Sequence, residues 1–403
     1  MGQTFCGAAN LPLLQPIGQF GTRHEGGHDA ASARYIFTAL APTTRLLFPS
    51  ADDRLLRIQT EDGQLVEPTW LCPVVPLILI NGTEGIGTGW STRIANRSMQ
   101  NVIDSVRWAI DKATGVSPTP QPQLPPFYED FHGKIDISGQ IDNPHQFSSS
   151  GIAQWQRNGR KNSAQVAVEI LELPVGVWTS KYKEKLMRIL DTLPIIDFSE
   201  LHTEKRVHFR MTFDRKKLNP KIAAKSRHEL LNFLKLRNTV TENLVLFDEN
   251  GRLREFRNVA DIAKSFFEVR RAVYGRRIEA QTEESRQKLD YVWNQIKFID
   301  SVTSGSIELG KLQREELERK MLEMGFQTDP MRGRSGRSDG KTDFAYLLQM
   351  PLSRLTSDEI SRLADRQKQL EAALEAAKCA EWHATWHSDL DKLAAGVRKF
   401  NNN

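Results

Sequence analysis

Two heptad-like runs in the last third of the chain constrain its fold more than any other feature. Largely apolar side chains recur three and four positions apart from Val259 to Val273, and the same spacing returns from Ile360 to Leu374. After a gap, the second run resumes from Trp386 to Phe400. This period predicts long helices, either antiparallel in a stalk with a small globular insertion or packed in an ordinary helical bundle. Periodicity alone favours the bundle.

The chain before these runs has a mixed α and β pattern. An Asp-Gly step at Asp62 lies between short apolar runs and predicts the tight turn of a hairpin. A helix is expected to begin near Ser98, where apolar residues fall on one face, and a proline-rich linker follows from Pro118 to Pro126. The sequence from Gly133 to Phe213 is strand-like around a helical stretch from Ser180 to Leu190. The pattern predicts several domains.

The composition is that of a globular chain with a slightly basic balance. The 403 residues are 39% hydrophobic and carry 55 basic against 50 acidic side chains. Because these numbers nearly cancel, affinity for a polyanion has to come from local basic patches. The three cysteines lack the close spacing of a zinc site, so we expect free thiols in a reducing compartment. Without a leader pattern or a bilayer-long apolar run, the chain is expected to be soluble and intracellular.

The dipeptide Arg34-Tyr35 combines two groups that attack on a phosphodiester requires. A tyrosine phenol can act as a covalent nucleophile, and a guanidinium can grip a phosphate with two parallel hydrogen bonds. A dipeptide alone is more often a surface arginine beside a half-buried tyrosine. The surrounding motifs therefore have to decide between these interpretations.

The run from Leu13 to Leu40, LLQPIGQFGTRHEGGHDAASARYIFTAL, resembles the active-site tyrosine region of the eukaryotic DNA topoisomerase II family, a group of type IIA topoisomerases. Further motifs of that family follow in order along nearly the whole chain. They are Leu46 to Pro49, Val66 to Pro68, Leu79 to Trp90, Glu172 to Pro174 with Trp178, Leu244 to Asp248, and Tyr346 to Leu352.

The resemblance implies a multidomain α+β fold. Residues 1–91 would form a partial winged-helix domain that carries the active-site tyrosine, residues 92–254 an α/β tower domain, and residues 255–403 a long antiparallel coiled coil with a small globular exit-gate insertion. It also reverses the preference for a helical bundle. We expect the stripes Val259 to Val273 and Ile360 to Leu374 to pair with each other, which leaves Leu347 and Leu348 of the insertion for a homodimer contact.

The resemblance implies an ATP-dependent enzyme that cleaves and reseals both strands of double-stranded DNA through a phosphotyrosyl intermediate. Tyr35 would be the nucleophile, attached to the 5′ phosphate, and Arg34 would stabilise the transition state. Two positions depart from the family pattern: Ala33 stands where proline is usual, and His28 where lysine is common. The remaining DNA contacts implied are those of Arg23, His28, Ile86 and Trp178.

Two of these contacts have ordinary structural alternatives. Ile86 stands between glycines and could be an apolar wedge that kinks a duplex at a base step, although such a residue is more often core. Trp178 could equally be a packed aromatic. The glycine run around Ile86 also invites a dinucleotide-binding interpretation, but its spacing is G-x-G-x-G and prolines interrupt the preceding apolar run.

The family requires Mg²⁺ and ATP, which we expect to be bound by modules absent from this chain. The chain is therefore expected to be a C-terminal fragment of the breakage-reunion core, a split gene product or a truncated gene model. A non-catalytic DNA-binding and dimerisation protein is the alternative. The resemblance implies the nucleus, and the arginines from Arg332 to Arg337 suit either a nuclear address or a solvated loop. His383 and His387 share a helix face, but two ligands do not make a metal site.

Overall fold

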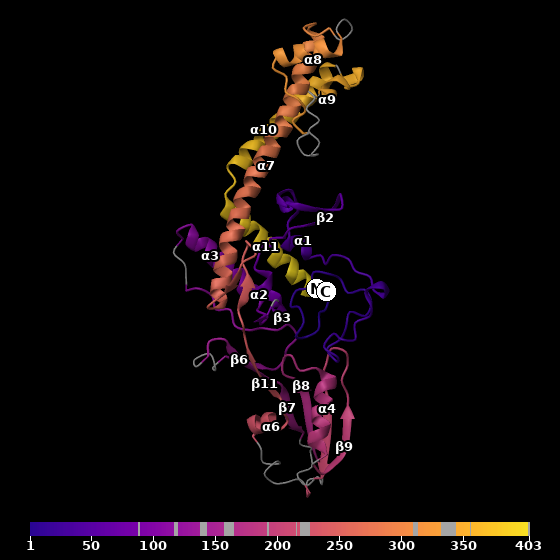
Figure 1. Cartoon of the computed structure of the whole chain (residues 1–403), viewed down its shortest axis with the longest axis vertical. Helices are drawn as coiled ribbons and strands as arrows, with labels where there is room; N and C mark the ends of the chain where they lie inside the picture. Colours follow the sequence, from indigo (N-terminus) through magenta and orange to yellow (C-terminus); the bar gives the residue numbers. More distant parts are fainter. Residues whose placement is uncertain are drawn as a thin grey trace. The chain divides into compact units, whose positions relative to one another are not determined.

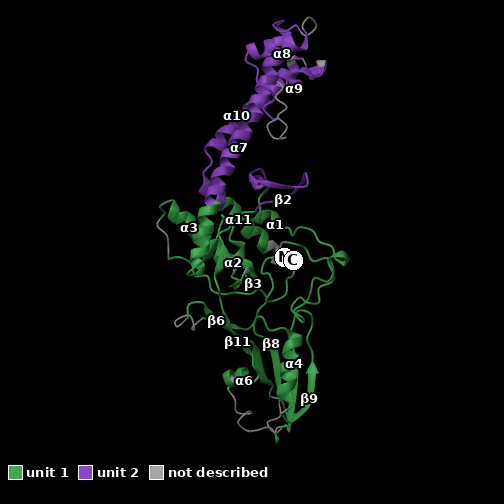
Figure 2. Cartoon of the chain, in the orientation of Figure 1, with its two compact units in different colours: residues 1–50, 71–270, 387–403 green, residues 51–70, 271–386 purple. Residues whose placement is uncertain are grey.

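The structure is a computed structural model of the chain, and it divides into two compact units that Figure 2 shows in different colours. Unit 1 comprises 1–50, 71–270 and 387–403, and unit 2 comprises 51–70 and 271–386. The arginines predicted at Arg332 to Arg337 and the linker start at Pro118 lie outside the described residues. The described residues are 1–87, 89–116, 120–137, 143–156, 165–191, 193–214, 216–217, 226–308, 313–331, 344–354 and 356–401.

A four-stranded antiparallel sheet in unit 1 contains β7 (Ile152–Gln156), β8 (Gln165–Glu172), β9 (Ile195–Glu200) and β10. Its strand order is β7-β8-β10-β9. Alternate residues of β10 (Phe209–Asp214) are buried, as the two-residue period of a strand requires when one face meets a core. Helix α4 (Thr179–Leu190) lies alongside the sheet (Figure 1) and adds Tyr182 and Leu186 to the same core. The hydroxyl of Tyr182 donates to the carbonyl of Leu234 at 2.9 Å, so this buried polar group is satisfied.

Helix α3 (Met99–Ala113) confirms the helix expected to begin near Ser98. Ser98 is its N-cap residue with an extended backbone, and Val102, Ile103, Val106 and Ile110 are buried. These positions are three and four apart, the spacing of one helix face, so the amphipathic pattern sets which side of α3 meets the core.

The predicted hairpin is present in unit 2 as β1 (Ile58–Glu61) paired with β2 (Gln64–Pro68). Its two turn residues, Asp62 and Gly63, have φ of +48° and +78°. Positive φ at both positions is the requirement of a type I′ turn, which an Asp-Gly pair meets at low cost. The local turn chemistry therefore determined this feature.

The long helices are α7 (Val259–Thr303), α10 (Ser357–Lys378) and α11 (Trp382–Asn401). Within unit 2, α10 runs beside α7 (Figure 1). One core cluster joins Val292 and Ile299 of α7 to Leu363 and Leu370 of α10. The prediction that Val259 to Val273 pairs with Ile360 to Leu374 is therefore wrong, because in an antiparallel hairpin the residues nearest the insertion pair first.

The insertion between the long helices has its own core. Phe298 and Ile307 pack there with Met321, Phe344 and Leu347, all of them buried. Leu347 was predicted to supply a dimer contact, but its side chain is fully buried inside the protomer. The prediction of a dimer contact by Leu347 is therefore corrected, because a side chain buried inside one protomer cannot contact a second copy.

None of the described helices is both long enough and apolar enough to span a membrane. The other described elements, with the bounds given by the structure, are η1 (Ala33–Tyr35), α1 (Thr44–Leu47), η2 (Ser50–Leu55), α2 (Leu77–Asn81), β3 (Thr83–Gly87), β4 (Trp90–Ile94), β5 (Lys134–Asp136), β6 (Gln146–Ser150), α6 (Arg227–Phe233), β11 (Arg237–Thr241), β12 (Val245–Phe247), β13 (Leu253–Glu255), α8 (Arg314–Glu323), α9 (Ala345–Leu348) and η5 (Leu352–Arg354).

Candidate active site and nucleic-acid interface

Tyr35 ends the single 3₁₀ turn η1 and projects from the surface of unit 1. The turn closes through a hydrogen bond from the Tyr35 amide to the carbonyl of Ser32 at 2.9 Å. The residue is 67% exposed, and the guanidinium carbon of Arg34 lies 4.9 Å from the centre of its ring. The structure therefore brings the two residues together and leaves the phenol accessible to a large substrate.

Backbone hydrogen bonds to an earlier segment hold this turn in place. Ile17 and Phe37 exchange two of them, at 3.0 and 3.2 Å, and Leu14 forms a second antiparallel bridge with Leu40. Ala33 stands where the resembled family usually has proline, yet the turn is formed. The segment after Tyr35 is thus extended and paired at two points.

Asp29 organises the loop before the tyrosine, and sequence reasoning did not single it out. Its carboxylate accepts hydrogen bonds from the Thr22 amide at 2.8 Å, the Thr22 hydroxyl at 2.7 Å and the Gln19 amide at 3.2 Å. Partial burial acts to raise the pKa of Asp29, but the hydrogen bonds from Thr22 outweigh it and hold the pKa below its usual range. A sequence pattern does not reveal the role of Asp29, because its hydrogen-bond partners lie within one irregular loop and follow no helix or strand period.

Arg23 does not occupy the position predicted for a DNA contact. It is only 5% exposed and donates to the carboxylate of Glu172 and, at 3.4 Å, to the carbonyl of Leu173. Glu172 also accepts from the amides of Leu173 at 2.8 Å and His132 at 3.2 Å. Because Glu172 neutralises its charge in this buried pair, Arg23 is a structural cation. The prediction that Arg23 contacts a DNA phosphate is corrected accordingly.

His28 and Trp178 differ in what they present to solvent. His28 is exposed on the loop before Tyr35, where it is available to an anion. Trp178 packs edge-to-face against Phe5, with ring centres 5.8 Å apart, and a Cβ on Gly26 would lie 2.3 Å from its ring. Trp178 is therefore a packed aromatic on which the loop rests, the structural alternative left open by the sequence.

Ile86 lies near the tip of the β3–β4 hairpin, opposite Ser91. Its side chain is 87% exposed, and a Cβ on Gly85 or Gly87 would meet no atom within 4 Å. An isoleucine in this position loses the stabilisation that burial of an apolar side chain provides. The core interpretation of Ile86 is excluded, and the hairpin places the glycine run outside the strand–turn–helix arrangement of a dinucleotide-binding site.

Further apolar side chains line a cavity beside Ile86. This cavity of about 420 Å³ lies between the β3–β4 and β12–β13 hairpins and is lined by Ile86, Trp90, Phe247 and Leu253, among others. Phe247 is 66% exposed, and the Thr92 hydroxyl joins the two hairpins by donating to the carbonyl of Val245 at 2.6 Å. The sequence matched the motif around Phe247 without assigning it a place in the site.

No metal centre is visible among the described residues, where no group of three or more His, Cys, Asp or Glu side chains is placed to hold an ion. The imidazole of His383 lies 3.0 Å from Glu381, and that of His387 lies 3.3 Å from Asp111. Each histidine of the predicted pair thus has its own carboxylate.

Comparison with known proteins finds matches over nearly the whole chain. The family model that describes the A subunit of DNA gyrase/topoisomerase IV matches residues 1–391. The chain belongs to this type II topoisomerase family. The resemblance inferred from the motifs is thereby confirmed.

Individual relatives place the chain within the eukaryotic branch of the family. It is 58% identical to a Caenorhabditis elegans protein named putative DNA topoisomerase 2, mitochondrial, over 98% of this chain and 33% of the relative. It is 36% identical to chicken DNA topoisomerase 2-alpha over 97% of this chain and 25% of the relative. The chain therefore spans about a quarter to a third of the relatives it matches.

A solved structure confirms the predicted fold class. The DNA-binding, cleavage and re-ligation domain of Plasmodium falciparum topoisomerase II superposes with a TM-score of 0.82 at 30% identity, covering all of this chain and 54% of the other. Small sheets combined with a long helix, the mixed architecture described above, are what the two structures share.

Proposed function

We propose that this chain carries the DNA-breaking tyrosine of an ATP-dependent type II topoisomerase, and that Tyr35 is this residue. The observation that carries the proposal is the 67% exposed phenol beside the Arg34 guanidinium, on a turn whose flanking segments are paired. Membership of the topoisomerase family and the relatives' names support it. Because the chain spans only a fraction of those relatives, activity belongs to the complete protein.

The chemistry proposed is a reversible transesterification. The Tyr35 oxygen forms a bond to the phosphorus of a DNA phosphodiester, and the bond from that phosphorus to the 3′ oxygen breaks. The phenol loses its proton and the departing 3′ hydroxyl gains one, so no water or oxidant is consumed. Arg34 stabilises charge on the phosphoryl oxygens, a contribution of about 3 to 4 kcal/mol for a well-placed donor. Attack by the same hydroxyl reseals the strand.

Ile86 is proposed to deform the DNA segment that is cut. Insertion of an apolar side chain between base pairs partly unstacks them and kinks the duplex. The exposure of Ile86 on a hairpin without neighbouring side chains at Gly85 and Gly87 supports this role. His28, exposed on the loop before Tyr35, is proposed to contact a phosphate.

The complete enzyme is proposed to be a homodimer in which two copies of Tyr35 cut opposite strands so that another duplex can pass. The proposed domains are a partial winged-helix domain (1–91), a tower domain (92–254), and a coiled coil with the exit gate (255–403). Mg²⁺ and ATP are proposed as its cofactors, bound outside this chain. Among the described residues, no group of His, Cys, Asp or Glu side chains is placed to hold a metal ion.

Two compartments are compatible with the relatives. The nuclear location implied by the family resemblance is retained as a proposal. A mitochondrial location is the second candidate, because the relative named mitochondrial shares 58% identity whereas topoisomerase 2-alpha of chicken shares 36%. Imaging of the tagged full-length protein with nuclear and mitochondrial markers distinguishes them.

A covalent-adduct assay tests the proposed nucleophile. The chain is joined to the N-terminal half of a related topoisomerase 2 and incubated with end-labelled duplex DNA, and protein-bound label is measured after denaturation. Tyr35→Phe is expected to abolish the adduct, whereas Tyr291→Phe, in unit 2, should leave it unchanged. An adduct of equal yield with Tyr35→Phe would remove Tyr35 from the mechanism. DNA binding without an adduct in any variant, including the wild type, would favour the non-catalytic alternative. The exposed Tyr35 argues against that alternative.

A further inference from the structure

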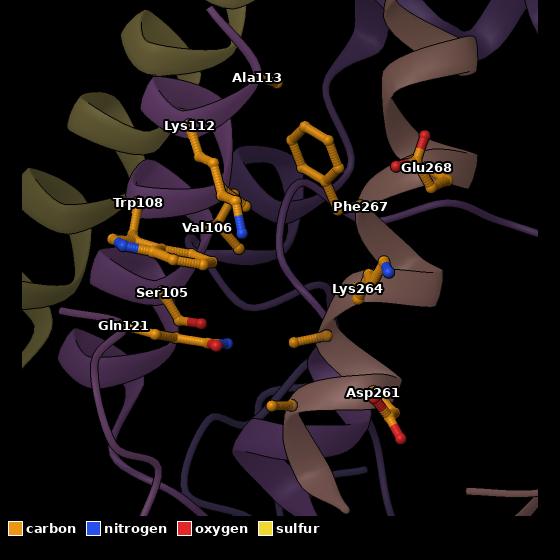
Figure 3. Close-up of a pocket in the computed structure, with 13 residues that line it drawn as sticks. Ser105, Val106, Trp108, Lys112, Ala113, Gln121, Asp261, Lys264, Phe267 and Glu268 are labelled. Carbon is orange, nitrogen blue, oxygen red and sulfur yellow. The ribbon is translucent and has the colours of Figure 1, made fainter. Parts of the chain in front are cut away.

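A second cavity of unit 1 lies between α3 and the first turns of α7. It has a volume of about 430 Å³, within the range of sites for small organic molecules. Figure 3 shows Trp108 of α3 and Phe267 of α7 extending into it from opposite sides. Unlike Tyr35 and Ile86, neither residue belongs to the DNA-breaking site proposed above.

Small residues keep this cavity open. Ala109 of α3 and Ala260 and Ala263 of α7 line it between the larger side chains. Two helices with alanines on facing sides can approach until their side chains interdigitate. Here those faces border a cavity instead, so a space remains that a planar ring can fill between Trp108 and Phe267.

Polar groups at the cavity are suited to an anion at one end of such a ring. Ser105 is 3% exposed, and its hydroxyl, which points into the cavity in Figure 3, donates to no acceptor among the described residues. The ammonium of Lys112 lies 4.9 Å from the centre of the Trp108 ring. The α7 side of the cavity carries Asp261, Lys264 and Glu268, whereas the α3 side carries Lys112, which forms no ion pair with a carboxylate of a described residue. Gln121 adds an amide at the same side.

We infer that this cavity binds a planar aromatic carboxylate. The ring lies between Trp108, Phe267 and the alanine methyl groups, where aromatic contacts and apolar burial stabilise it. The carboxylate faces the Lys112 ammonium and accepts a hydrogen bond from the Ser105 hydroxyl. A ligand bound in this way contacts α3 and α7 together and stabilises the folded arrangement of both helices by mass action.

Calorimetric titration of the full chain with 2-naphthoate, and with neutral 2-naphthamide as the matched probe, tests the inference. Naphthoate should bind more tightly than the amide. Lys112→Gln should weaken naphthoate binding about fivefold, the upper range for an exposed charge pair, and leave naphthamide binding unchanged. Ser105→Ala should weaken naphthoate binding about tenfold. Lys181→Gln, an exposed lysine on α4, is the control and should change neither probe.

Substitutions that fill the cavity with a larger side chain test whether the probe binds inside it. Ala263→Leu should abolish binding of both probes while the circular dichroism spectrum stays that of the wild type. If that variant does not fold, Ala109→Leu makes the same test from α3. Absence of naphthoate binding, equal affinity for the two probes, or unchanged affinity in a folded cavity-filled variant would each overturn the inference. None of these outcomes depends on DNA cleavage by Tyr35.

Discussion

Replacement of Glu172 by glutamine tests whether Arg23 is a structural cation. The side chains of Arg23 and Glu172 are 6% and 2% exposed, so water screens their charges little. The Glu172 carboxylate accepts hydrogen bonds from Arg23 and from the amides of His132 and Leu173. A glutamine has only one carbonyl oxygen and turns an amino group toward these donors. Glu172→Gln therefore leaves a buried positive charge unpaired.

The expected cost is large. Removal of one partner of a buried ion pair typically costs about 3 to 5 kcal/mol. Glutamine retains one acceptor, so we expect the lower end, about 3 kcal/mol, which corresponds to roughly a hundredfold change in an opening equilibrium. Amide hydrogen exchange suits the measurement, because a chain with two compact units does not have to unfold in one step. Exchange at His132 and Leu173 should accelerate by about that factor.

Matched variants distinguish a structural role of Arg23 from a role as a phosphate contact. Glu375→Gln, in an exposed pair with Lys378, should change stability by less than about 0.5 kcal/mol. Arg23→Met combined with Glu172→Met should be less destabilised than Glu172→Met alone, since no unpaired charge then remains. Unchanged exchange in Glu172→Gln would refute the reasoning. If Arg23→Met also lowered the salt slope of DNA binding by about 0.9, Arg23 would be a phosphate contact after all.

Two further predictions concern the loop before Tyr35 and the residues it rests on. Burial raises the pKa of Cys6 to about 12, so its thiol should resist alkylation by iodoacetamide at pH 8. The exposed Cys379 should react under the same conditions. Comparable labelling of the two cysteines, measured by mass spectrometry, would contradict this prediction. Gly26 has a φ of +63°, and a Cβ there would clash with Trp178, whereas Gly63 has a φ of +78° and open space around it. Gly26→Ala should therefore destabilise unit 1 more than Gly63→Ala destabilises its hairpin. Equal melting temperatures of the two variants would contradict the packing described.

Local features of the fold could be predicted from the sequence. The Asp62-Gly63 turn and the buried face of α3 follow from turn chemistry and helical period, which act between neighbouring residues. The pairing of α7 with α10 depends on the length of the insertion, and periodicity carries no information about it. The break between α10, which ends at Lys378, and α11, which begins at Trp382, falls in the gap that the sequence pattern shows between Leu374 and Trp386.

In the candidate site, too, features set by neighbouring residues could be predicted, whereas contacts between distant segments could not. Tyr35 and Ile86 are exposed on a turn and on a hairpin, and turn and glycine patterns act between neighbouring residues, so the sequence contains a signal for both. Arg23 was misassigned because its partner Glu172 lies 149 residues away in the sequence. The packing of Trp178 against Phe5 also joins distant segments, so only the folded chain reveals it.

The central claim is that Tyr35 forms the covalent bond to DNA, and peptide mapping of the adduct tests it most directly. After the joined protein is trapped on DNA and the DNA is trimmed with nuclease, trypsin should release the peptide from Tyr35 to Arg45, in which Tyr35 is the one tyrosine. We predict that this peptide carries the mass of a nucleotide through its 5′ phosphate, with fragment ions that locate the mass on Tyr35. A nucleotide on any other peptide would contradict the account.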